Sequence, residues 1–111
     1  MGEDKTKKVS KELTVRYDIL SDVIVSPVRI EILNKLSDHP DGLSYEDLVN
    51  HIRPELRKYN VQKHLIGLVE DGVIVKDKDE KYSLSKVGED TYDTLAKIAL
   101  RAKSEQIFSN P

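Results

Sequence analysis

The feature that most constrains the fold of this 111-residue chain is a change of hydrophobic period at Gly72. Before Gly72, apolar residues recur every three or four positions, which is typical of short amphipathic helices. After it, residues 73–75 are all β-branched, residues 76–81 are all charged, and residues 82–84 can return as a partner strand. The sequence therefore predicts a helical body followed by a two-stranded β-hairpin with a charged tip.

Caps and breakers divide the segment before Gly72 into short helices. The first helix is predicted from about residue 11 to 24 by an apolar stripe at helical spacing, which Ile19 and Val23 widen into a face that two neighbouring elements could share: Leu13, Tyr17, Leu20 and Ile24. Ser26 and Pro27 form an N-cap and a first helical position, so a second helix is predicted over residues 27–36. Its buried residues are expected to be Val28, Ile32, Leu33 and either Leu36 or Ile30. Residues 1–10 hold too little apolar surface to bury and are expected to be a disordered tail.

Two more short helices follow a turn at residues 38–42, which is dense in helix-stopping residues. Ser44 begins a near match to a capping box, and the helix that it predicts cannot continue through Pro54. A fourth helix is predicted over residues 59–71, and Gly72 stands where a left-handed C-cap belongs. The apolar face of this fourth helix is expected to be Val61, Leu65, Leu68 and Val69.

The longest predicted helix follows the hairpin, with Ser85 as its N-cap and an end near Phe108. One apolar seam runs along it: Val87, Thr91, Leu95, Ile98 and Ala102. This seam is too apolar for a solvated helix on a small domain, so we expect it to pair with a second copy of the chain. The predicted homodimer interface, which includes part of the first helix, is Leu13, Tyr17, Leu20, Tyr92, Leu95, Ile98, Ala99 and Ala102.

Composition narrows the class of protein. A length of 111 residues is typical of one domain, and no stretch approaches the roughly 20 apolar residues of a membrane span. The chain has no cysteine, which excludes disulfides, thiolate metal sites and cysteine nucleophiles and favours the reducing cytoplasm. Eighteen Lys and Arg against twenty Asp and Glu give a net charge of −2, which is not typical of a nonspecific nucleic-acid coat.

The order of the predicted elements is that of a winged helix-turn-helix domain: mainly α, with a small β-hairpin and a long C-terminal helix. We therefore expect the DNA-binding domain over residues 11–84 and a dimerisation helix over residues 85–108. The linker at residues 52–58 is longer than the usual three- or four-residue turn between the two helices. The pose of the recognition helix is left open by that length.

Three stretches resemble the ArsR-like winged helix-turn-helix regulators of prokaryotes. Residues 26–33, SPVRIEIL, are similar to the opening helix of that family; residues 61–74 are similar to its recognition helix and exit; residues 82–88, YSLSKVG, are similar to the strand-to-helix junction. The resemblance implies a homodimeric transcriptional regulator that binds double-stranded DNA, with the helix near residues 60–70 in the major groove and the hairpin beside the backbone. The cysteine-rich metal box of the family is absent.

The candidate DNA-binding residues lie at and just before the predicted recognition helix, where residues 53–63 carry four bases and one acid. Asn60 and Gln62 can read adenine bidentately, and Lys63 can reach guanine or phosphate. Phosphate contacts are expected from the residues that precede the helix, from the helix rim and from the hairpin tip: Arg57, Lys58, Tyr59, His64, Lys78 and Lys81. For Arg29, in the second helix, a structural role is favoured.

Catalytic and metal chemistry find no support in the sequence, which has no glycine-rich phosphate loop, no nucleophile elbow and no metal-ligand pair. We expect no enzyme, no cofactor and no metal, since the three histidines, His39, His51 and His64, fall in different elements. A small-molecule effector is not identified. The predicted function is a nucleoid-associated transcriptional regulator that binds a pseudo-palindromic operator. The alternative is a winged-helix module for protein contacts, such as a scaffold or a subunit of the transcription machinery.

Overall fold

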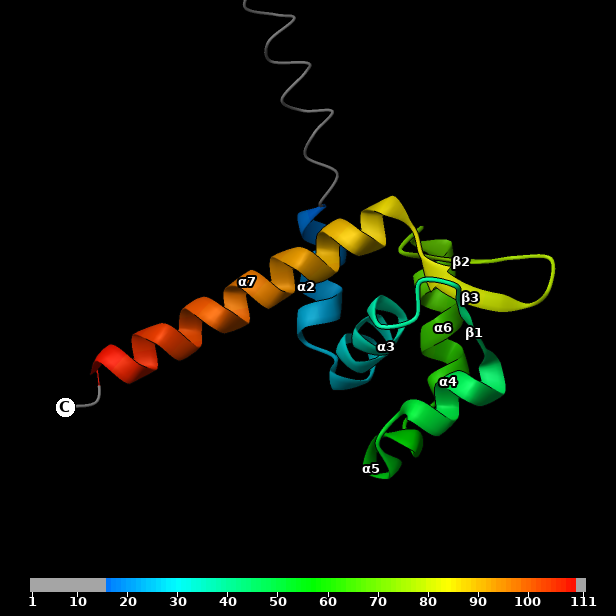
Figure 1. Ribbon diagram of the computed structural model, residues 1–111, viewed down its shortest axis with the longest axis horizontal. Helices are drawn as coiled ribbons and strands as arrows, with labels where there is room; N and C mark the ends of the chain where they lie inside the picture. Colours follow the sequence, from blue (N-terminus) through cyan, green and yellow to red (C-terminus); the bar gives the residue numbers. More distant parts are fainter. Residues whose placement is uncertain (1–15, 110–111) are drawn as a thin grey trace, which may run out of the picture.

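A computed structural model describes residues 16–109, with side chains described through Arg101. Short helices build one body, a small antiparallel sheet lies on one side of it, and the longest helix runs across the body and beyond it (Figure 1). The helices are α2 (Tyr17–Ile24), α3 (Pro27–Ser37), α4 (Tyr45–His51), α5 (Pro54–Arg57), α6 (Val61–Glu70) and α7 (Lys86–Ser109). The strands are β1 (Leu43–Ser44), β2 (Ile74–Lys76) and β3 (Lys81–Leu84). The predicted mainly α class with a long C-terminal helix is confirmed.

The predicted caps begin the helices where the sequence indicates. The Ser26 hydroxyl accepts a hydrogen bond from the Arg29 amide at 3.2 Å, and the Ser44 hydroxyl accepts one from the Asp47 amide at 3.2 Å. Ser85 accepts from the Gly88 amide at 3.1 Å at the start of α7. Each hydroxyl satisfies one of the orphan N–H groups of a first helical turn, which fixes where the helix starts.

The core lies between α3 and the elements that surround it. Fully buried side chains come from every helix except α5, from β2 and from two positions between elements: Val23, Ile32, Leu33, Leu36, Leu48, Ile52, Leu65, Leu68, Val73, Ile74 and Thr91. The predicted inner face of α3 is confirmed, including Leu36 in preference to the half-buried Ile30. Val69 was expected inside but is 39% exposed, because the inward face of α6 ends at Leu68.

The inner face of α2 is narrower than the predicted one. Ile19, Leu20 and Val23 are buried, whereas Tyr17 is 82% and Ile24 43% exposed. The expected helix start near residue 11 and the expected tail at residues 1–10 lie outside the described residues. Because α2 packs against both α3 and α7, the side of the helix that carries Ile19, Leu20 and Val23 is covered by these two neighbours.

The sheet has three strands, one more than the predicted hairpin. The short strand β1 pairs antiparallel with β3 in the register Leu43 opposite Tyr82, and β2 pairs with β3 on the other side. The sequence indicates only a cap at Ser44, because two residues are too few to show a strand period. The third strand ties the start of α4 to the hairpin.

The linker at residues 52–58 also differs from the prediction, because it contains the four-residue helix α5. Pro54 occupies the first turn of α5, where its missing N–H costs nothing, and Leu56 is buried in the core. The long linker is therefore an ordered helical step between α4 and α6. None of the helices within residues 16–109 has the length and the hydropathy needed to cross a membrane.

Candidate nucleic-acid interface

Helix α6 carries the centre of the candidate interface. It buries Val61, Leu65 and Leu68 against the body and turns Gln62 and Lys63 outward in its first turn. Neither outward side chain forms a side-chain hydrogen bond or an ion pair within the described residues. An amide and an ammonium group are therefore available to a polar partner at the start of the helix, where base-reading side chains of recognition helices are placed.

Asn60 is the N-cap of α6, which changes what its side chain can offer. Its Oδ1 accepts a hydrogen bond from the Lys63 amide at 3.1 Å. Bidentate reading of adenine needs both the oxygen and the nitrogen of an asparagine amide. The predicted bidentate reading of adenine by Asn60 therefore competes with its role as the N-cap. The Gln62 side chain does not cap the helix, so both of its amide groups can contact a base.

Arg57 binds the protein itself. Its Nε donates to the Ile52 carbonyl at 2.9 Å and its Nη2 donates to the Asn50 carbonyl at 3.0 Å. Both carbonyls lie at the C-terminal end of α4, where unpaired carbonyls and the negative end of the helix dipole favour a cation. Arg57 is exposed and keeps its positive charge at the surface. Its two hydrogen bonds hold the end of α4 against α5.

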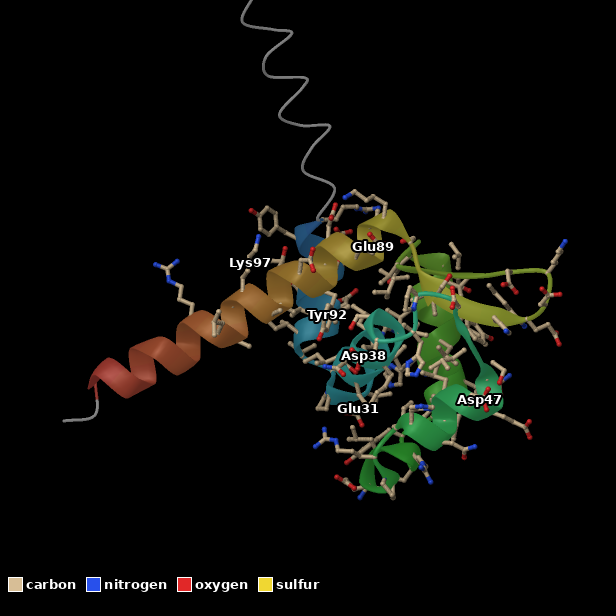
Figure 2. All side chains as sticks on the ribbon, in the orientation of Figure 1. Glu31, Asp38, Asp47, Glu89, Tyr92 and Lys97 are labelled. Carbon is tan, nitrogen blue, oxygen red and sulfur yellow. The ribbon has the colours of Figure 1, made fainter. Side chains whose placement is uncertain are left out.

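Glu31 of α3 holds the start of the linker, a contact that sequence reasoning missed. Its Oε2 accepts from the Arg53 amide at 2.7 Å, and its Oε1 accepts from the Arg53 Nε at 3.2 Å. The Glu31 side chain is only 12% exposed, while that of Arg53 is 58% exposed (Figure 2 labels Glu31 on α3). One base of the basic stretch is thus neutralised. A carboxylate between two isoleucines of a helix expected to be buried was the signal for such a contact.

Three further candidates follow the linker. Lys58 places its Nζ 5.4 Å from the centre of the Tyr59 ring, at a distance typical of a cation–π contact. Tyr59 is 52% exposed, and Lys63 is exposed in the next turn. With Arg57, these residues form a basic face at the junction of α5 and α6, which we call the α5–α6 basic face: Arg57, Lys58, Tyr59 and Lys63.

His64 lies behind this face and contacts α3. Its Nδ1 accepts a hydrogen bond from the Arg29 Nε at 3.1 Å, and the Arg29 Nη1 lies 3.7 Å from the Asp71 carboxylate. Partial burial lowers the pKa of His64 below its ordinary value, and the charges of Arg29 and Lys63 lower it further. The structural role favoured for Arg29 is confirmed by these contacts. His64, predicted at DNA, is engaged on its α3 side.

The hairpin tip is shaped by Asp77, which the sequence analysis did not single out. Its Oδ1 accepts from the Asp79 amide at 2.8 Å and from the Lys81 amide at 2.9 Å, as aspartate does at turns. Lys76 lies 3.8 Å from Glu80. Lys78 and Lys81 are exposed and form no ion pair within the described residues. Two cations therefore remain for a partner at the tip.

The predicted dimer residues separate into two groups. Leu20 and Leu95 are buried within one chain, and the Tyr92 hydroxyl accepts from the Asn34 Nδ2 at 3.0 Å between α7 and α3 (Figure 2). A second copy can add little to their burial. Tyr17, Ile98 and Ala99 are exposed, whereas Leu13 and the side chain of Ala102 lie outside the described residues. The first half of the predicted seam therefore belongs to the core of the chain.

Two of the three histidines lie together, although they were expected to be dispersed. The rings of His39 and His51 pack edge to face with centroids 4.8 Å apart. Their Nδ1 atoms are 2.8 Å and 2.7 Å from the carbonyl oxygens of Lys35 and Asp47, respectively. Within residues 16–101, no group of three or more His, Asp or Glu side chains is arranged to hold a metal ion.

The order and packing of these elements match a solved structure, that of a MarR family transcriptional regulator from Silicibacter pomeroyi. The TM-score is 0.65, and the similarity covers 83% of this chain at 23% sequence identity. The fold is a winged helix. The chain spans 64% of the length of that regulator's chain. No family model matches the chain, and no curated protein sequence matches it either.

The likeness concerns the fold. The solved structure is described as MarR family, whereas the motifs of this chain resemble ArsR-like regulators, and the winged helix is what the two descriptions share. Within this fold, α4, α5 and α6 form the helix-turn-helix, β2 and β3 form the wing, and α7 follows the wing. The α5–α6 basic face and the wing tip lie on these elements.

Proposed function

We propose that this chain is a sequence-specific DNA-binding transcriptional regulator that acts as a homodimer on a pseudo-palindromic operator, in the cytoplasm and without enzymatic activity. The observation that carries the proposal is the exposed first turn of α6, where Gln62 and Lys63 face outward beside Arg57 and Lys58. An amide for base edges and cations for phosphates are the two kinds of group that reading a duplex requires.

The surroundings of α6 support this proposal. Arg53 is neutralised by Glu31, but the remaining cations of residues 53–63 are exposed. The wing adds Lys78 and Lys81 at its tip. A net charge of −2 for the whole chain is compatible with this role, because a local basic face provides the phosphate contacts while the rest of the surface is acidic.

A homodimer is proposed from α7. The helix continues to Ser109; of its side chains described through Arg101, the last buried one is Leu95, and the next turn exposes Ile98 and Leu100. Pairing this outer part of α7 with a second copy would cover those residues and set two copies of α6 side by side. We therefore keep residues 11–84 as the DNA-binding domain and residues 85–108 as the dimerisation helix, with half-sites about 10 base pairs apart or a multiple of that distance.

The experiment that tests the proposal begins with genome-wide capture of bound DNA, followed by a titration on the enriched site. We expect the logarithm of the binding constant to fall linearly with the logarithm of salt concentration, as release of counterions from phosphates requires. The proposal is wrong if simultaneous alanine substitution of the five outward residues leaves the affinity for genomic fragments unchanged at low salt: Arg57, Lys58, Asn60, Gln62 and Lys63.

A module for protein contacts is the alternative, and one observation favours it. An open groove of about 440 Å³ beside the start of α6 is lined largely by apolar side chains, among them Val25, Leu56 and Tyr59. A scaffold would use such a surface and would show little salt dependence. If the chain is such a module, Val25→Ser should abolish partner binding and leave any DNA affinity unchanged. If it reads DNA, alanine at Lys58 and Lys63 should lower DNA affinity, and Val25→Ser should not.

A further inference from the structure

Arg29 of α3 contacts one face of α6 along two of its turns. Its Nε donates to the His64 Nδ1 at 3.1 Å, and its Nη1 lies 3.7 Å from the Asp71 Oδ2. Between them the guanidinium passes over Gly67, where an added Cβ would lie only 2.7 Å from Nη2. The Arg29 side chain is 19% exposed. A largely covered cation thus connects α6 to α3 at the positions 64, 67 and 71.

The direction of the first hydrogen bond fixes the protonation state of the imidazole. Arginine offers only donors and keeps its proton at any physiological pH. The His64 Nδ1 must therefore be an unprotonated acceptor, with the ring proton on Nε2. Protonation of Nδ1 would turn the acceptor into a donor that faces a donor and would place two cations 3.1 Å apart.

The charged groups around His64 favour its neutral form. Arg29 faces it from α3, Lys63 adjoins it on α6, and Lys58 and Tyr59 lie in the segment before α6. The acid near this group is Asp71, which pairs with Arg29 itself. His64 also lines the open groove of about 440 Å³ beside α6, so solvent protons can reach the ring.

We propose that Arg29 is a positioning residue that holds α6 on α3 through neutral His64, and that protonation of His64 in weak acid releases this hold. The proposal rests on the proposed function only in its consequence for DNA. It also assigns His64 a different task from the phosphate contact that the sequence indicates.

The expected pH dependence follows from the lowered pKa of His64 in the folded chain. A histidine whose pKa is lower folded than unfolded stabilises the fold above its ordinary pKa of 6.5, and this stabilisation is lost as the pH falls through the folded value. On DNA, protonation adds a charge that favours any phosphate but frees α6 to tilt. The ratio of operator affinity to nonspecific affinity should therefore decrease.

The first arm of the test needs no DNA. In the full chain, ¹⁵N NMR should find the His64 Nδ1 unprotonated at neutral pH, and the amide signals of α6 should shift with the same midpoint as the imidazole, below 6.5. In His64→Gln, whose amide oxygen can still accept from Arg29, those amides should not titrate. Arg29→Gln should raise the midpoint of His64, because a nearby positive charge is removed.

His51→Gln is the matched control, since His51 is an exposed histidine on α4 whose ring packs on His39 and whose Nδ1 lies 2.7 Å from the Asp47 carbonyl oxygen, with no hydrogen bond or ring contact to Arg29 or α6 within the described residues. It should titrate like the unsubstituted chain. The proposal is overturned if His64 carries its proton on Nδ1, if its midpoint lies at or above 6.5, or if the α6 amides titrate equally in His64→Gln.

The second arm measures the ratio of affinities for the enriched operator and for a random duplex. Between about pH 7.5 and about pH 5.5 the ratio should fall roughly tenfold in the unsubstituted chain and in His51→Gln, and stay constant in His64→Gln. A constant ratio in the unsubstituted chain overturns the proposal. If the first arm gives the expected result but no duplex binds at any pH, the DNA-binding function has failed and the positioning role of Arg29 stands.

Discussion

Helices α6 and α7 contact the same body, yet they end in different situations. α6 is ten residues long and is held on its inner side along its length, by Val61, Leu65 and Leu68 in the core and by Arg29 from α3. α7 is 24 residues long, but Leu95 is the last buried one among its side chains described through Arg101. Beyond that point it extends away from the rest of the described chain (Figure 1).

The exposed sides of the two helices differ in chemistry as well as in length. The outward start of α6 is polar and cationic, whereas the outward part of α7 presents Ile98, Leu100 and two alanines together with two basic side chains. Apolar side chains gain free energy by leaving water, and amides and ammonium groups gain it by exchanging water for other polar groups. The comparison therefore assigns a polar partner to α6 and an apolar partner, a second copy, to α7.

The largest expected effect separates the inner from the outer part of α7. Leu95→Asp places a carboxylate at a position that is 9% exposed, and we expect the chain to unfold, because the cost approaches the roughly 5 kcal/mol that stabilises a small domain. Ile98→Asp lies one turn later at a position that is 43% exposed. It should leave the fold intact and convert a dimer to a monomer in analytical ultracentrifugation.

Circular dichroism distinguishes unfolding from loss of the dimer. Leu95→Asp should lose the helical signal, whereas Ile98→Asp should keep it and melt at the temperature of a folded monomer. Lys97→Asp is the matched control, an exposed charge change on the neighbouring position of α7. Should the unsubstituted chain sediment as a monomer at concentrations of tens of micromolar, the assignment of α7 to a second copy would be wrong.

A second prediction concerns the reading face of α6. Gln62→Ala should cost about 1 to 3 kcal/mol of binding to the operator and leave binding to random duplexes unchanged, because a bidentate amide contact discriminates between bases. Ile66→Ala, one turn later and 52% exposed, is the control that shortens an outward side chain without removing a polar group. Equal losses on operator and random DNA in competition titrations would place Gln62 among the phosphate contacts instead.

The sequence predicts well where helices begin, and it predicts poorly which distant residues they contact. Ser26, Ser44 and Ser85 cap helices as expected, because a cap and its amide are only three residues apart. Arg53 with Glu31 and His64 with Arg29 are 22 and 35 residues apart, and no local pattern relates such positions. These two contacts are what fix the linker and α6 on α3.

Burial along α7 shows the same limit. The seam from Val87 to Ala102 has one helical period, and the period carries no information on where the body ends. Thr91 is fully buried and Ile98 is not, because α2 and α3 lie under the first part of the helix only. The predicted interface therefore included Leu20 and Leu95, which the chain buries by itself.

A smaller effect is expected from the two cations that precede α6. Lys58→Ala should weaken binding to operator and random DNA alike and reduce the salt slope by about one unit, with no change in the free energy of unfolding. Arg57→Ala should also cost about 1 to 2 kcal/mol of stability, because two carbonyls at the end of α4 lose their donor. Urea titration measures this difference, and equal stability of the two variants would contradict it.

The smallest expected effect is that of metal ions, for which we predict no change in stability or DNA affinity. The contact between His39 and His51 makes this worth measuring, because their Nδ1 atoms face backbone carbonyls and their Nε2 atoms are left as acceptors. Two imidazoles alone make an incomplete site for zinc, which usually takes three or four protein ligands, and residues 16–101 arrange no third ligand with them. Calorimetry with zinc, nickel and cobalt should find no stoichiometric binding tighter than roughly micromolar. Tighter binding that disappears in His39→Gln and shifts DNA affinity would show that a second copy or residues outside the described range complete the site.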